Sequence, residues 1–233
     1  MTELADNALT TLAVIASELD DYSEGDDADV DARVARYINA ASSRFENATG
    51  RKWYYTEGHE ERVAGHGTGR LTVTDHLPVE SIDKIELLSG VISGDIQVTA
   101  VADSSYEIED SDVGWIRRTS FGVWKNTARH VTDISTHPRA GTEKKLYRVT
   151  YDGGHVTPAQ GDDDEELDRT LPYDIEQAIV EYVVMLWQSR GRDATIQSQS
   201  SLSGSVTYEM LDGERVPTSF KRLVDSYRLR GVA

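Results

Sequence analysis

The chain has 233 residues, of which 38% are hydrophobic, enough for one large domain or two small ones with a buried core. It contains no cysteine, which excludes disulfides and thiolate metal sites. Its 41 acidic residues outnumber 24 basic ones, and a net charge of −17 argues against a protein that grips duplex DNA. The longest apolar run, from Ile179 to Trp187, is too short for a membrane span, and we expect neither a signal peptide nor a membrane contact.

The charged residues are biased, because most of the bases are arginine and the acids are abundant. This composition resembles that of proteins from salt-loving microbes. In molar salt the Debye length shrinks to about 3 Å, so repulsion between neighbouring carboxylates is largely screened. The composition therefore predicts a halophilic origin, with an acidic DNA mimic or an acidic mesophilic protein as alternatives.

Two helices are predicted at the N-terminus. Apolar residues recur at helical spacing from Leu4 to Leu19, followed by the acidic loop "DDYSEGDDAD". The clearest amphipathic helix runs from about Asp29 to Thr49, and Gly50 is placed to end it. Residues 1–55 are thus predicted as the N-terminal helical part.

From Glu60 the apolar period shortens toward two. Short runs such as "RLTVT", "SIDKIELL", "YEIED" and "YRVTY" are separated by Gly, Asp, Ser and Pro, which predicts an antiparallel β region over residues 56–155. Residues 120–143 have no period and are predicted as a long exposed loop. Gly153 and Gly154 would turn the chain at the end of the last strand, because glycine reaches positive φ without penalty.

An acidic crossing and a core helix are predicted over residues 156–192. The run "GDDDEEL" reads as a surface loop, and Pro172 suits the first turn of the next helix. From Tyr173 to Arg190 that helix is apolar on nearly every side, so it must be covered by other parts of the fold or by another subunit.

Residues 193–233 are predicted as an extended arm and a terminal helix. "TIQSQSSLSGSVTYEML" is polar and then strand-like, which is typical of a segment that orders against a partner. The ending "VPTSFKRLVDSYRLRG" carries what reads as the only basic cluster, and docking onto a protein is favoured over a membrane surface. The predicted fold class is α+β: a helical core, made of the N-terminal helices and a long apolar C-terminal helix, with an inserted antiparallel β region and an extended C-terminal arm.

No catalytic or metal-binding constellation stands out, and no cofactor is predicted. His59 and His66 flank Glu60 and Glu61 without the H-E-x-x-H zinc pattern. The acids from Asp162 to Glu166 lack the spacing of a calcium-binding loop. Two alternatives to a structural role stay open: a soluble acidic enzyme using His59, His66 and Glu61, and an acidic DNA-mimic binding protein.

Several motifs, taken in order, resemble the head-to-tail connector, or adaptor, family of tailed viruses. They are "DADVDARVARYINAASSRFENATGRKW", "HEERVAGHGTGRLTVTDHLPVESIDKIELLSG", "YEIEDSDVGWIRR", "VTYDGGH", "LPYDIEQAIVEYVVMLWQSRG" and "VPTSFKRLVDSYR". Each is weak alone, but their order spans nearly the whole chain. The acidic insert at 161–166 and the loop at 120–143 are larger than the family pattern leads us to expect.

The resemblance implies a non-enzymatic virion protein of the neck, at the head-tail junction, assembled in the host cytoplasm. It implies a homo-oligomeric ring, typically a dodecamer, that docks under the portal protein and offers a platform for the stopper or tail-completion protein. Double-stranded DNA would pass through its channel without specific binding. The acidic surface would suit a virus of a haloarchaeon.

The resemblance also assigns roles to residues. The helices at 29–49 and 173–190 would form the ring wall, with Tyr37, Phe45, Ile179, Tyr182, Val183, Leu186 and Trp187 as the candidate ring-packing residues. The portal-docking arm would comprise Ser198, Ser203, Val206, Tyr208, Phe220, Lys221, Arg222, Leu223, Tyr227 and Arg228.

Overall fold

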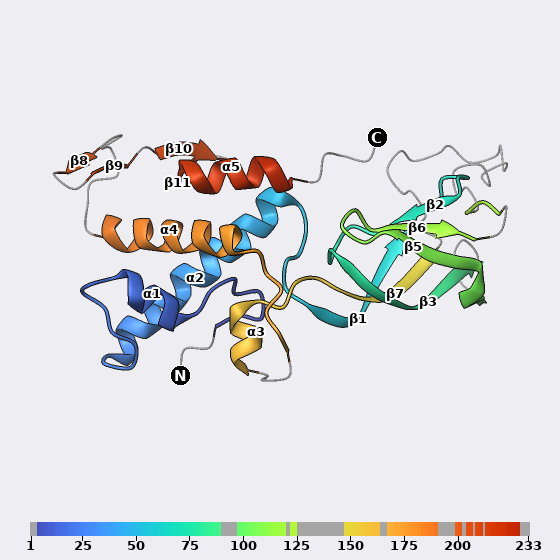
Figure 1. Cartoon of the computed structure of the whole chain (residues 1–233), viewed down its shortest axis with the longest axis horizontal. Coiled ribbons are helices and arrows are strands. Elements are labelled where there is room, and N and C mark those ends of the chain that lie inside the picture. The colour runs from blue at the N-terminus through green and yellow to red at the C-terminus, as the bar shows by residue number, and fades with distance from the viewer. Residues whose placement is uncertain are drawn as a thin grey trace, which may run out of the picture. The chain divides into compact units, whose positions relative to one another are not determined.

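The computed structural model describes residues 4–89, 97–119, 122–124, 147–163, 167–190, 199–201, 204–206, 208–211 and 213–228. The chain divides into two compact units: unit 1 comprises residues 1–54 and 155–233, and unit 2 comprises residues 55–154 (Figure 1). Unit 1 is mainly helical and unit 2 is built from antiparallel sheets. The predicted α+β class with antiparallel strands is therefore confirmed.

Of the two helices predicted at the N-terminus, the first is much shorter than predicted and the second is close to its predicted length. Helix α1 spans only Leu12–Glu18, because residues 4–10 form turns and Thr11 caps the helix by accepting a hydrogen bond from the amide of Val14. Helix α2 spans Ala28–Thr49, close to the prediction. Gly50 ends it in the left-handed conformation with φ of 79°, which glycine adopts without strain.

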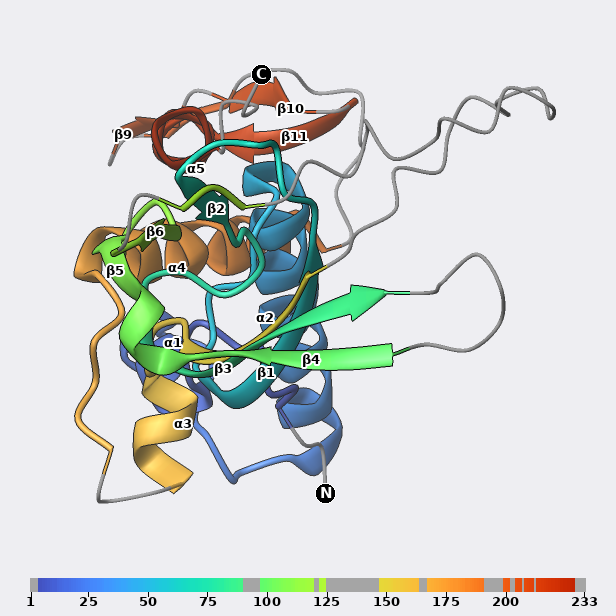
Figure 2. The ribbon, with the colours of Figure 1, turned by 90° about the vertical axis from the view of Figure 1, so that its right-hand side faces the viewer.

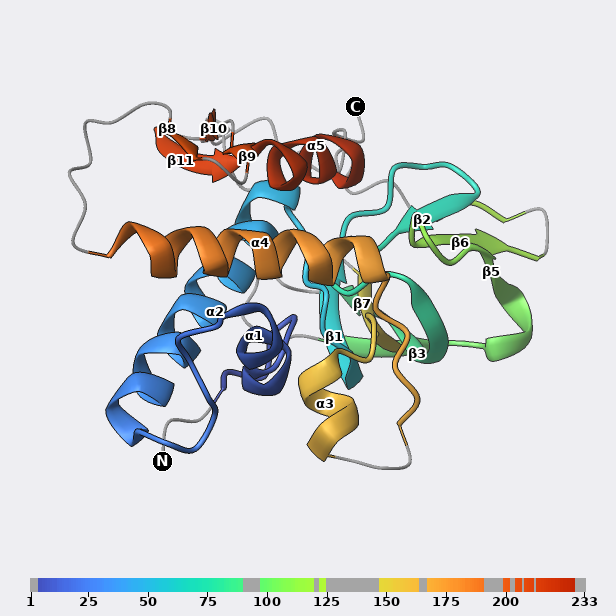
Figure 3. The same cartoon turned by 60° about the vertical axis from the view of Figure 1, so that its left-hand side comes forward.

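Helix α4, Tyr173–Ser189, lies at the centre of unit 1 and contacts α1, α2 and the terminal helix α5, Thr218–Tyr227 (Figure 3). The prediction of a long helix that is apolar on nearly every side is wrong. The helix has 17 residues and exposes Gln177, Glu181 and Gln188 along one side, whereas α1, α2 and α5 cover its other sides. Over the described part of the chain, every helix is too short or too polar to cross a membrane.

The remaining elements of unit 1 are short. Helix α3 spans Pro158–Asp163 and takes up the start of the predicted acidic loop, whose residues 164–166 lie outside the described part. Strands β8, Gln199–Ser201, and β9, Gly204–Val206, form one hairpin. Strands β10, Tyr208–Leu211, and β11, Glu214–Pro217, form a second hairpin that contacts α5.

Unit 2 contains two antiparallel sheets (Figure 2). The larger one has the order β1-β7-β3-β4, formed by Thr56–Val63, Tyr147–Gly153, Val79–Ser89 and Gln97–Val101. The smaller one has the order β2-β6-β5, formed by Arg70–Thr72, Trp115–Arg118 and Tyr106–Asp110, and a 3-10 turn at Asp103–Ser105 precedes β5. The last strand in sequence, β7, is thus an interior strand of its sheet, and Tyr147, Val149 and Tyr151 are fully or almost fully buried.

The two glycines at the end of β7 are required for different structural reasons. Gly154 has φ of 100°, so it makes the sharp turn that was predicted. Gly153 is still in the strand, where a Cβ atom would lie 2.6 Å from the carbonyl oxygen of His76. The prediction that both glycines serve the turn is therefore corrected, since Gly153 permits a close approach of two backbones.

The predicted loop at 120–143 falls almost entirely outside the described residues. Within it, residues 122–124 are described, and Trp124 is fully buried. Its indole nitrogen donates to the carbonyl of Gly69 at 3.1 Å, and its ring meets Tyr147 edge to face at 5.2 Å. Trp124 is thus a core residue of unit 2 rather than part of an exposed loop.

Candidate functional site

The terminal helix α5 carries most of the residues predicted for docking, and one side of it packs into unit 1. The fully buried ring of Phe220 lies 4.8 Å from the ring of Tyr182 on α4 and 5.6 Å from that of Phe45 on α2. Val224, one turn later, is also fully buried. Phe220 therefore joins α5 to two other helices of the same chain.

The C-terminal end of α5 is fixed by an aromatic and cationic cluster. Tyr227 meets Trp53 edge to face at 5.2 Å, and the guanidinium of Arg51 lies 4.2 Å from the centre of the Trp53 ring. The hydroxyl of Tyr227 donates to Asp174 at 3.3 Å. Burial, and next the charge of Asp174, raises the pKa of Tyr227. The helix thus folds against its own unit along its whole length.

The outer side of α5 is cationic and available to a partner. Arg222 and Arg228 are exposed, and Leu223 is half-buried. Lys221 is half-buried and lies 3.9 Å from Asp225, one turn along the helix. A partner that contacts α5 would therefore meet guanidinium groups and part of an apolar side chain, whereas Phe220 is inside.

The polar arm that precedes α5 is only partly described. Ser198 and Ser203 lie outside the described residues, whereas Val206 belongs to β9 and Tyr208 to β10. Met210 on β10 is 59% exposed, which places a large apolar side chain at the surface beside α5. The predicted arm is thus, where described, a pair of hairpins.

The predicted ring-packing residues lie mostly inside the chain. Five of them are buried in the core of unit 1, namely Phe45, Ile179, Tyr182, Val183 and Trp187, and the other two, Tyr37 and Leu186, are half-buried against that core. The apolar side of α4 thus meets α2 and α5 of the same chain, and only Tyr37 and Leu186 keep surface that another subunit could reach.

The alternative enzyme site contains a carboxylate whose hydrogen-bonding capacity is filled. Glu61 is buried, and it accepts hydrogen bonds from the amides of Thr74 and Asp75, from the Thr74 hydroxyl and from the hydroxyl of Tyr151. Burial, and next the charge of Glu61, raises the pKa of Tyr151 strongly. Because both oxygens of Glu61 are engaged, this residue ties β1 to the turn after β2 and to β7 rather than serving as a base.

The histidines near Glu61 do not form a metal site either. His59 packs on His76 with ring centres 4.3 Å apart, and its Nε2 atom lies 3.4 Å from Asp75. His66 is exposed in the loop between β1 and β2. Among the described residues, no three His, Asp or Glu side chains are grouped so that they could hold a metal ion.

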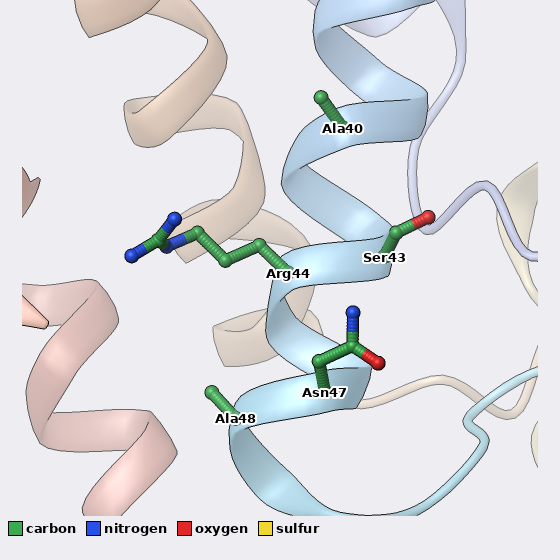
Figure 4. Close-up of a pocket in the computed structure, with 5 residues that line it drawn as sticks. All are labelled: Ala40, Ser43, Arg44, Asn47 and Ala48. Atoms are coloured by element: carbon green, nitrogen blue, oxygen red, sulfur yellow. The ribbon is translucent and has the colours of Figure 1, made fainter. Parts of the chain in front are cut away.

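A basic face on α2 was not predicted from the sequence, where the basic cluster lies at the C-terminus. Arg33 and Arg36 are exposed on the side of α2 that points away from the core, and Arg44 follows on the same side. Next to them lies a hollow of about 290 Å³ lined by Ala40, Ser43, Arg44, Asn47 and Ala48 (Figure 4). The helical period of these arginines was the signal that could have revealed the face.

The chain matches no protein-family model and no curated protein sequence. Its fold is nevertheless similar to solved structures along the entire chain. The neck of an empty gene transfer agent particle contains a chain with a TM-score of 0.56 and 16% identity, and the match covers 100% of this chain and 95% of the other.

Two further structures match over the same shares of both chains, at 15% identity. One is the neck of a native gene transfer agent particle, with a TM-score of 0.53. The other is the virion of a native gene transfer agent particle, with a TM-score of 0.51. At such low identity the likeness establishes the fold alone.

Proposed function

We propose that this chain is a structural subunit of the neck of a tailed, phage-like particle, where it forms an adaptor ring between the capsid and the tail. The observation that carries the proposal is the match over 100% of this chain and 95% of a neck chain. A match of one common supersecondary motif would not carry it, because such motifs occur in many unrelated proteins. The order of motifs in the sequence supports the same role.

The charge distribution suits a ring through which a genome passes. A net charge of −17 repels the phosphates of duplex DNA, so DNA would slide through the channel without being held. The exposed bases on the outer side of α5, Arg222 and Arg228, would instead contact protein. We assign this side of α5 to the portal protein, and the stopper or tail-completion protein would bind elsewhere on the ring.

We propose ring packing for fewer residues than the resemblance implies. Tyr37 and Leu186 are the members of that set with surface left for another subunit. A twelve-subunit ring, assembly in the host cytoplasm and a haloarchaeal host all remain predictions from the resemblance and the composition.

The proposal is tested by immuno-electron microscopy of particles from the producing culture, with an antibody raised against this chain. We expect label at the head-tail junction of intact particles. Heads and tails separated from each other serve as the internal control, since a neck protein stays at one end of one of these pieces. An antibody against the major capsid protein should label the whole head in the same samples.

The outcome against the proposal is equally clear. If the chain stays in the soluble fraction of the cell and no particle carries label, it is not a neck protein. Pull-down from that fraction would then separate the remaining hypotheses, because a DNA mimic would retain a basic DNA-binding protein in a salt-sensitive way.

A further inference from the structure

The outward side of α2 carries a stripe of arginines and small polar residues. At 3.6 residues per turn, Arg33, Arg36, Ala40, Arg44 and Asn47 fall within an arc of roughly 100°. From Arg33 to Asn47 every charged residue of this stripe is an arginine, in a chain with 41 acids and 24 bases. Such a uniform positive sign is unusual on so acidic a protein, and it adds a second cationic surface to the outer side of α5.

Within unit 1 this face lacks acidic partners where it is most exposed. Arg33 and Arg36 form no ion pair with any carboxylate in the described part of the chain. Arg44, by contrast, donates to the carbonyl of Leu211 and so links α2 to β10. Ala40 and Ala48 lie along the same side of the helix as Arg44, and their small side chains leave the hollow open (Figure 4).

The segment that leads into α2 has the opposite character. Residues 18–29 contain a run of exposed carboxylates, which are Glu18, Asp20, Glu24, Asp26, Asp27 and Asp29. Asp21 is the acid of this segment that pairs with a base in the described structure, at 2.7 Å from Arg190. One chain thus carries two exposed surfaces of opposite sign, neither of which neutralises the other within the chain.

We propose that the arginine face of α2 binds the acidic segment 18–29 of a second copy of this chain. The two surfaces are different, so the contact is heterologous, and heterologous contacts close into a ring when the rotation permits. Duplex DNA is the less favourable occupant, because the same acidic segment adjoins the face and would repel phosphates. The inference rests on the proposed ring and names the surfaces that join its subunits.

Charge-reversal variants test the proposal on the full-length chain. The first variant carries R33E and R36E, and the second carries E24R and D26R, which are exposed acids outside the N-cap of α2. Sedimentation velocity should show each variant alone with a self-association constant lowered at least about tenfold, since close charge pairs at an interface are strongly coupled. Mixing the two variants should restore assembly when they alternate. The acidic α2 face of the first variant then meets the basic segment 18–29 of the second, and the unmutated surfaces meet as in the wild type.

A matched control carries R62E and R117E, two exposed residues of unit 2 that belong to neither proposed surface, with the same change in net charge. It should assemble like the wild type. Circular dichroism of each variant verifies the fold, and the rescue by mixing excludes misfolding as the cause of a loss.

Three results would overturn the inference. They are a wild-type chain that stays monomeric, an R33E/R36E variant that assembles normally, and a loss that mixing does not restore. If R33E/R36E leaves assembly intact but weakens the retention of duplex DNA, the face contacts phosphates instead. None of these results alters the location of the chain in particles, so failure here is separable from failure of the proposed neck function.

Discussion

Replacing Phe220 by alanine tests whether the terminal helix belongs to the core of unit 1 or is a detachable arm. The ring is fully buried and contacts Phe45 and Tyr182 on two other helices. Truncation of a buried phenylalanine costs about 3–5 kcal/mol, a range that includes the loss of its aromatic contacts. Because whole domains are stable by about 5–15 kcal/mol, we expect a large fall in the free energy of unfolding.

Urea denaturation followed by far-ultraviolet circular dichroism measures this change. Among the described residues all α-helices lie in unit 1, so the signal mainly reports the unit that contains Phe220. The control is Arg222→Ala on the exposed side of the same helix, which should alter the free energy of unfolding by less than about 0.5 kcal/mol. A loss below about 1 kcal/mol for Phe220→Ala would refute the reasoning and return α5 to the role of a free arm.

Three further perturbations follow from local geometry and charge. Gly114→Ala should destabilise unit 2 by more than about 3 kcal/mol, since φ is +70° and the new Cβ would lie 2.3 Å from the carbonyl oxygen of Val73. Gly58→Ala, with positive φ but open space, should cost only about 1–2 kcal/mol in the same urea assay. Arg148 donates to Glu86 at 2.7 Å, and this bond lowers the pKa of Glu86. The stabilisation is therefore complete above the ordinary pKa of 4.5 and is lost as the pH falls through the lowered value, so Glu86→Gln should weaken the acid dependence of the urea midpoint in that window. An unchanged acid dependence would contradict this assignment. Finally, if the acidic composition is an adaptation to salt, the urea midpoint should rise from low to molar potassium chloride, where the Debye length falls to about 3 Å; a midpoint independent of salt would reject the halophilic origin.

The candidate surfaces were only partly accessible from the sequence. Phe45, Tyr182 and Trp187, which the resemblance assigns to ring packing, lie in the core of unit 1. Apolar character alone, however, does not distinguish burial within one chain from burial between subunits, and these residues proved to be internal. The arginine face was not predicted because the amphipathic pattern of α2 is defined by its apolar side, although Arg33 and Arg36 lie at the helical spacing of the opposite side.

The sequence by itself determined the features that depend on neighbouring residues. The bounds of α2 follow from the Asp27 cap, the 3.6-residue apolar period and the left-handed Gly50. The antiparallel character of residues 56–155 followed from short alternating runs between turn residues. Each of these signals lies within a few positions along the chain, so no distant contact is needed to read it.

Only the tertiary structure decided the features that depend on residues far apart in sequence. It placed β7 between β1 and β3, although more than 50 positions separate β7 from either strand. It brought the backbone of His76 so close to Gly153 that a side chain has no room there, and it packed Trp124 against Tyr147. Such pairings are selected by the fit of whole surfaces rather than by local propensity, which is why periodicity alone could not order the strands or identify the covered side of each helix.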